Sequence, residues 1–197
     1  MKRDVSCHLE LSADGPAELV FSVAVARGVP VVSESLSVTS SGALLEPVEI
    51  VDQHGTRLHR VRVDAGPVVL DYAATADGLA EPEPVDDLDR LRYLRQSRYC
   101  ESDTLAPTAA AEFTDLAGTS LLAAVVEWVH DRIAYVSGAS VATDSALDTL
   151  LARQGVCRDF AHLSIALLRA LGVPARLAAV YAPGLSPMEF HAVCEAM

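Results

Sequence analysis

Basic residues are scarce in this sequence. Lys and Arg number 15 against 27 Asp and Glu, which gives a formal net charge of −12 at pH 7. The acidic residues are spread along the chain, so they favour solubility, and no basic stripe is available to neutralise phosphates. The charge pattern therefore argues against binding to nucleic acid or to an anionic membrane.

Long apolar runs are also lacking. After Met1, polar and apolar residues alternate, whereas a signal peptide needs a continuous apolar stretch. The most apolar segment, residues 160–182, is interrupted by His162, Gly172 and Pro174, so we do not expect it to cross a bilayer as one helix. We expect a cytoplasmic protein without a secretory leader.

Several chemical motifs are missing. The sequence has no CxxC pair, no Gly-rich phosphate loop, no G-x-S-x-G elbow, no H-E-x-x-H motif and no calcium-binding loop. Nucleotide, serine-hydrolase and calcium-loop functions are therefore not indicated, and we expect neither a cofactor nor a metal. The cysteines are widely spaced, and in a reducing compartment each is expected to be a free thiol: Cys7, Cys100, Cys157 and Cys194.

The composition is that of a folded protein, with 51% hydrophobic and 21% charged residues over 197 positions. Residues 1–76 show the alternation of antiparallel strands, most clearly between Val5 and Leu11, and predict a β-sandwich-like domain. The other predicted strands are separated by turn signals that contain Gly and Pro, and they cover residues 18–26, 31–39, 46–51, 57–63 and 68–75.

Residues 77–90 are rich in Asp, Glu, Pro and Gly, including Pro82 and Pro84, and are predicted to be an exposed linker. In residues 91–197 the apolar period becomes helical. One helix is expected to begin at Thr119 or Ser120 and to continue to Ile133. The later elements are predicted as helices at 145–153, capped by Asp144, and from 156 to 171, followed by strands at 175–182 and 189–196.

Cys157 is predicted to lie in the first turn of a helix that starts near Val156, after Gly155. Unpaired N–H groups and the helix dipole stabilise an anion at this position, which lowers the pKa of a thiol and makes it a better nucleophile. A small buried cysteine is the alternative interpretation. The charged neighbours Arg158 and Asp159 favour the reactive one.

His191 is the candidate base that would accompany this thiol. It lies in the last predicted strand, where Cys194 points to the opposite face, and a half-buried polar residue is the alternative. Asp159 could orient a catalytic partner, or it could simply complement the helix dipole. The other histidines form no close Cys/His set that would hold zinc: His8, His54, His59, His130 and His162.

Two segments resemble the core of the transglutaminase-like superfamily. Residues 147–163 read LDTLLARQGVCRDFAHL, and residues 171–176 read LGVPAR. The family pattern is G-x-C opening a helix, G-I/V-P-A-R leading into a strand, and then H-A in the next strand. His191-Ala192 supplies the last part, 191 − 157 = 34 residues after Cys157. Residues 93–103, YLRQSRYCESD, also resemble the linker of bacterial members that have a β-rich N-terminal region.

The resemblance implies an α+β protein in which a papain-like core follows the β-rich domain. It implies that Cys157 attacks the carbonyl of a peptide or protein carboxamide, and that His191 relays the proton. The resulting acyl-thioester would pass to water or to an amine. A non-catalytic binding or scaffold module with the same fold is the alternative, and metal-dependent hydrolysis is a third hypothesis.

The sequence departs from the family pattern at its end. The third catalytic residue of the family, an Asp in the strand after the His strand, is not found, because only 197 − 191 = 6 residues follow His191. We expect a core that is incomplete at its C-terminal end, with an open sheet edge through which two copies could associate. Within the chain, Asp159 and Glu189 are the first alternatives for the missing carboxylate.

Overall fold

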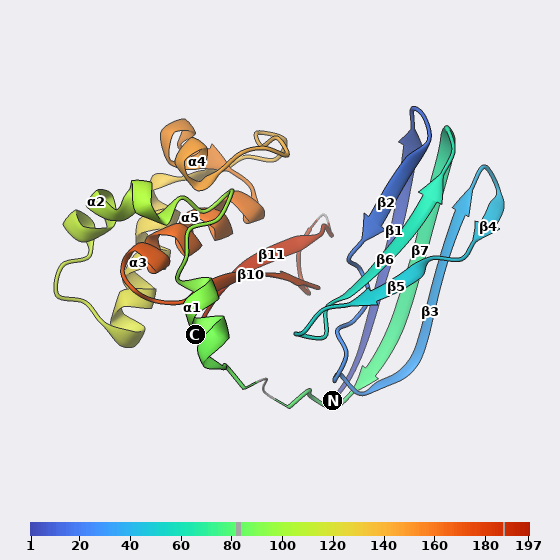
Figure 1. Cartoon of the computed structure of the whole chain (residues 1–197), viewed down its shortest axis with the longest axis horizontal. Coiled ribbons are helices and arrows are strands. Elements are labelled where there is room, and N and C mark those ends of the chain that lie inside the picture. Colours follow the sequence, from blue (N-terminus) through green and yellow to red (C-terminus); the bar gives the residue numbers. More distant parts are fainter. Residues whose placement is uncertain (82–83, 187) are drawn as a thin grey trace. The chain divides into compact units, whose positions relative to one another are not determined.

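The computed structural model describes residues 1–81, 84–186 and 188–197 (Figure 1). The chain divides into two compact units, Met1–Pro84 and Val85–Met197. The predicted α+β class is confirmed, because antiparallel sheets form the first unit and helices dominate the second. Pro82, on which the predicted linker partly depended, lies outside the described residues. Helix α1 (Asp87–Tyr93) begins inside the segment predicted to be linker.

The first unit contains two antiparallel sheets, with strand orders β1-β7-β3-β4 and β2-β6-β5. Figure 1 shows these two sheets lying face to face. The alternation predicted from the sequence is clear in β7, where Val68, Leu70 and Tyr72 are buried between more exposed neighbours. The strands are β1 (Lys2–Ala13), β2 (Ala17–Phe21), β3 (Val31–Ser40), β4 (Ala43–Leu45), β5 (Val48–Val51), β6 (Arg57–Val63) and β7 (Gly66–Asp77).

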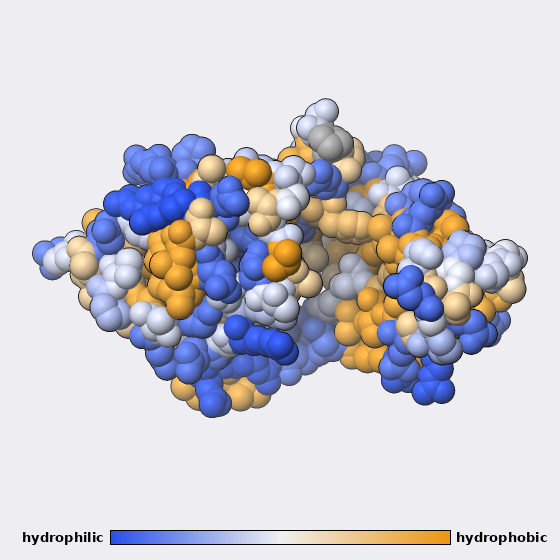
Figure 2. Space-filling view, turned by 90° about the horizontal axis from the view of Figure 1, so that it is seen from above, coloured by the Kyte–Doolittle hydropathy of each residue, from blue (hydrophilic) through white to orange (hydrophobic). Residues whose placement is uncertain are grey.

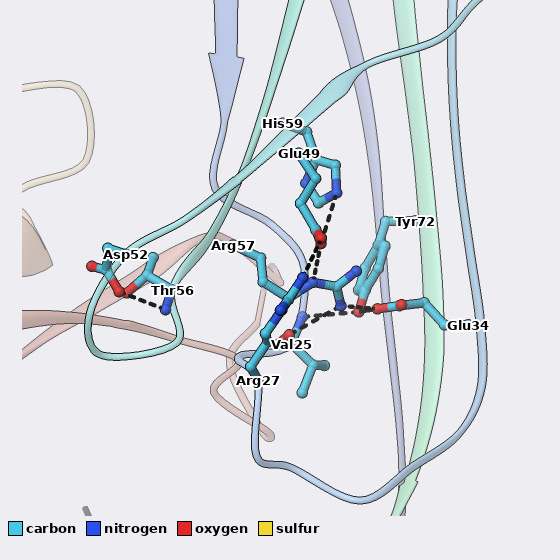
Figure 3. Close-up of polar contacts among 9 residues, drawn as sticks. All are labelled: Val25, Arg27, Glu34, Glu49, Asp52, Thr56, Arg57, His59 and Tyr72. Carbon is cyan, nitrogen blue, oxygen red and sulfur yellow. Dashed lines mark hydrogen bonds and ion pairs between the residues drawn. The ribbon is translucent and has the colours of Figure 1, made fainter.

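Arg57 on β6 joins the two sheets (Figure 3). Its Nε donates to Oε1 of Glu49 on β5 at 2.5 Å, and one terminal nitrogen donates to Oε1 of Glu34 on β3 at 2.6 Å. The hydroxyl of Tyr72 on β7 donates to the same Glu34 oxygen at 2.7 Å. The two carboxylates raise the pKa of Arg57, so it stays charged. Without this guanidinium, the partly buried carboxylates of Glu34 and Glu49 would lose their counter-charge. Arg57 therefore stabilises the packing of the two sheets.

The second unit is built around helix α5, which packs against α2, α3, α4 and the β10-β11 pair. Every residue from Ala161 to Leu168 is buried, which explains why this segment is apolar on more than one face of the helix. The other elements are α2 (Ser102–Glu112), α3 (Gly118–Arg132), β8 (Ala134–Tyr135), α4 (Ala146–Ala152), β9 (Gln154–Gly155), α5 (Cys157–Ala170), β10 (Ala175–Val180) and β11 (His191–Ala196).

Several predicted boundaries in this unit were wrong. Helices α1 and α2 were not predicted at all, and α3 begins at Gly118, so Thr119 and Ser120 lie inside it. Ser145 caps α4 by accepting a hydrogen bond from the Asp148 amide, where Asp144 was expected. Strands β10 and β11 are each two residues shorter than predicted at the loop that joins them. Asp and Ser are both good N-cap residues, and Asp144 and Ser145 are adjacent, so only packing decides which of them caps α4.

Candidate active site

Cys157 is the first residue of α5, as the sequence predicted to within one residue. The unpaired amides of the first helical turn and the positive end of the helix dipole therefore face the region of the thiol. At the other end of α5, Gly172 has a φ of +79°, a left-handed conformation that glycine adopts without steric strain and that commonly ends a helix. The thiol of Cys157 is partly exposed, whereas residues 161–168 of the same helix are all buried.

A short parallel bridge holds the residues before Cys157. Strand β8 pairs with β9, so that Tyr135 lies opposite Gly155. The amide of Ala134 donates to the carbonyl of Arg153 at 2.9 Å, and the amide of Val136 donates to the carbonyl of Gly155 at 3.0 Å. These two hydrogen bonds fix the backbone of residues 153–155, which leads into α5.

Asp159 fastens the first turn of α5 and is almost fully buried, at 1% exposure. Its Oδ2 accepts from the Val156 amide at 2.8 Å, and its Oδ1 accepts from the Ser140 hydroxyl at 2.9 Å and from Arg158 at 3.2 Å. Arg158 also donates to the carbonyl of Val141 at 2.6 Å. Both carboxylate oxygens are thus engaged in tying the helix start to the loop that follows β8.

His191 is the first residue of β11, and it pairs with Val180 on β10. The thiol of Cys157 donates to the carbonyl oxygen of Phe190, the residue before His191, at a distance of 3.8 Å. The fold therefore brings the start of α5 to the start of β11, although Cys157 and Phe190 are 33 residues apart in the sequence. The joining loop contains Pro187, which lies outside the described residues.

The other three thiols are poor candidates for a nucleophile. Burial raises the pKa of Cys194 to about 11, with Cys100 adding to the shift. Burial also raises the pKa of Cys100, which is 4% exposed, and that of Cys7, to which the charge of Asp71 contributes. Because the thiolate is the reacting species, these three groups are suppressed at neutral pH.

His162 lies in the second turn of α5, with 6% of its surface exposed. Its ring stacks on Tyr99, with centroids 5.5 Å apart and planes at 10°. Burial lowers the pKa of His162, the charge of Arg158 lowers it further, and Asp159, Glu101 and the main chain of Asp144 oppose this shift. The imidazole is consequently neutral at pH 7 and belongs to the packing of the unit.

We expect this buried imidazole to weaken the second unit in mild acid. A depressed pKa in the folded state means that the unfolded chain binds the proton first, so His162 contributes stability above its unfolded pKa of about 6.5. That contribution is lost as the pH falls from about 6.5 toward the lower folded pKa. Urea unfolding at pH 7.5 and at pH 5.5, followed by the fluorescence of the single tryptophan, Trp128 on α3, measures the effect.

The control is the His162→Gln variant, which cannot take up the proton. It should be less stable than the wild type at pH 7.5, because the ring packing on Tyr99 is lost, and it should lose less stability than the wild type between the two pH values. An equal loss in both proteins would assign the acid sensitivity to other groups.

Exposed apolar side chains lie on the segments next to Cys157, and sequence patterns did not single them out. Tyr135 and Phe190 are each 56% exposed, while Val136 and Val141 on the loop after β8 are 39% and 60% exposed. Figure 2 shows apolar patches of this kind interrupting the hydrophilic surface. Exposed apolar groups that lie together are typical of a binding surface. A two-residue strand such as β8 carries too short a pattern to be recognised in advance.

Two other classes of site were searched for in the described residues. No group of three or more His, Cys, Asp or Glu side chains is placed so that it could hold a metal ion. None of the helices in this part of the chain combines the length and the apolar character needed to span a membrane. The arrangement that remains is a thiol at a helix N-terminus, next to the strand that carries His191.

The chain is similar to known bacterial proteins. Residues 107–197 match the model of the transglutaminase-like superfamily. A crystal structure of a candidate cysteine protease from Cytophaga hutchinsonii is 34% identical and superposes with a TM-score of 0.88, covering 100% of this chain and 72% of that one.

Curated mycobacterial proteins match over shorter segments. An uncharacterised protein of Mycobacterium leprae is 38% identical over 58 residues, and one of Mycobacterium tuberculosis is 45% identical over 56 residues. These segments cover 29% and 28% of this chain and only 21% and 17% of the relatives. The matches to these curated proteins thus span about a fifth of their length.

Proposed function

Because this chain belongs to the transglutaminase-like superfamily, we propose that it is a thiol enzyme with Cys157 as its nucleophile and His191 as its base. The observation that carries the proposal is the position of Cys157 at the start of α5, with its thiol 3.8 Å from the carbonyl next to His191. The proposed substrate is a peptide or protein that presents a carboxamide.

In the proposed reaction, His191 takes the proton of the Cys157 thiol, and the thiolate adds to the carbonyl carbon of the carboxamide. A C–S bond forms, and the carbonyl π electrons move to oxygen. When this oxyanion collapses, the C–N bond breaks and the imidazolium of His191 gives its proton to the leaving nitrogen. The acyl-thioester then reacts with water, which completes hydrolysis, or with an amine, which completes acyl transfer.

Asp159 does not suit the part of the third catalytic residue. Its two oxygens already accept hydrogen bonds from Val156, Ser140 and Arg158, and the side chain is 1% exposed. A carboxylate used in this way secures the helix that carries the nucleophile. Glu189, which is exposed and lies two residues before His191, is the alternative within the chain that is open to test.

The test of the proposal is the relative reactivity of the four thiols. With limiting iodoacetamide at pH 7.5, we expect Cys157 to be alkylated first, because the pKa values of Cys7, Cys100 and Cys194 are all raised. Mass spectrometry of the partly labelled protein identifies the modified residue. Preferential alkylation of Cys7 or Cys194 would contradict the assignment, and an inert Cys157 would favour a binding or scaffold module.

A further inference from the structure

Tyr135 lies beside the proposed nucleophile and has no assigned role. Its main chain pairs with Gly155, two residues before Cys157. The residues on both sides of Tyr135 are also held, because the Ala134 and Val136 amides donate to the carbonyls of the segment before α5 at 2.9 and 3.0 Å. The backbone of Tyr135 is therefore fixed relative to the start of α5, even though its side chain is 56% exposed.

The ring of Tyr135 is directed toward the face of α5 that carries the thiol. It contacts the ring of Phe160 with centroids 5.9 Å apart. Phe160 follows Cys157 by three residues, and residues at this spacing are neighbours on one face of a helix. The aromatic contact thus keeps the phenol on the same side of α5 as Cys157.

The hydroxyl of Tyr135 is close to the reacting groups. Partial burial raises the pKa of Tyr135, the negative charges of Cys157 and Glu189 raise it further, and the main-chain N–H of Cys157 acts in the opposite direction through hydrogen bonding. The phenol therefore keeps its proton at neutral pH. A protonated phenol whose oxygen accepts from this N–H keeps its own O–H free to donate to an acceptor beside Cys157.

We propose that the hydroxyl of Tyr135 donates a hydrogen bond to the oxyanion that forms when the Cys157 thiolate adds to a substrate carbonyl. Preorganised donors of this kind stabilise the negative charge that develops on the oxygen in the transition state. Tyr135 transfers no proton in this step. It stabilises the negative charge while the C–S bond forms and releases the oxygen when the C–N bond breaks. The assignment rests on the proposed function of Cys157.

The test compares two reactions of the same thiol in the full chain. Acylation by p-nitrophenyl acetate passes through an oxyanion, whereas alkylation by iodoacetamide displaces iodide at carbon and does not. In Tyr135→Phe, which keeps the ring against Phe160, acylation of Cys157 should fall by about 10²- to 10³-fold, the usual loss for one oxyanion donor. The alkylation rate and the thermal midpoint should stay at the wild-type values.

The matched control is Tyr93→Phe, which removes the hydroxyl of a tyrosine on α1 in the same unit and should leave the acylation rate unchanged. Acylation of Tyr135→Phe at the wild-type rate would overturn the role of Tyr135 while leaving the nucleophile in place. Equal losses in acylation and alkylation would also overturn it, because the hydroxyl would then act on the thiol or on the fold. A wild-type Cys157 that is alkylated but never acylated would contradict the proposed function, and this role with it.

Discussion

Replacing Cys157 by Ala is expected to abolish thioester formation with p-nitrophenyl acetate, with ester turnover falling by about 10⁴- to 10⁶-fold, as when a nucleophile is removed from other acyl-transfer enzymes. The reason is that the three remaining thiols have raised pKa values and little thiolate at neutral pH. Release of p-nitrophenol and the mass of the trapped protein measure turnover and acylation separately. A variant that is still acylated at wild-type rate would show that another residue is the nucleophile.

The companion variant is His191→Gln, which retains a polar side chain but cannot accept the proton of the thiol. Its acylation rate should fall by about 10²- to 10⁴-fold, the range for loss of a general base. His130→Gln is the matched control, because His130 lies exposed in the last turn of α3. If both histidine variants acylate equally well, the thiol does not depend on His191, and the dyad is wrong.

Gly155→Ala is expected to destabilise the second unit and to slow the reaction of Cys157. A Cβ at Gly155 would lie 2.7 Å from the Cβ of Asp159 and 2.9 Å from its Oδ2. Asp159 cannot move away without breaking its bonds to Val156 and Ser140. Overpacking of this kind costs about 1 to 3 kcal/mol in the free energy of unfolding. Urea unfolding followed by Trp128 fluorescence gives the stability, and the rate of iodoacetamide labelling reports on the thiol.

Gly15→Ala is the matched control for this prediction. A Cβ at Gly15 meets no atom within 4 Å, and Gly15 is absent from the residues with positive φ, so neither unfolding of the second unit nor labelling of Cys157 should change. If Gly155→Ala behaves like Gly15→Ala in both measurements, the close approach of Gly155 to Asp159 does not control the position of α5. The glycine two residues before the cysteine would then need another explanation.

The start of α5 shows how far local sequence can be trusted. Gly155, followed by apolar residues at helical spacing, predicted a helix that begins near Val156, and α5 begins at Cys157. The prediction succeeded because helix initiation depends on residues a few positions apart. Helix α2 was not predicted, because its local sequence contains Pro107 and has no amphipathic pattern. This helix is stabilised by packing against α5, which a local pattern does not reveal.

The sequence by itself determined the α+β class, the alternation that builds the first unit, and the position of Cys157 at the start of a helix. These features follow from short-range periodicity and from recognisable motifs. The catalytic partnership of Cys157 with His191 stays a prediction. Only the tertiary structure decided which groups meet at the start of α5. Tyr135 is brought to Cys157 by the two-residue strand β8. Phe190 is brought there by a fold that joins segments 33 residues apart. Contacts between distant segments depend on the packing of whole elements, and no local pattern encodes them.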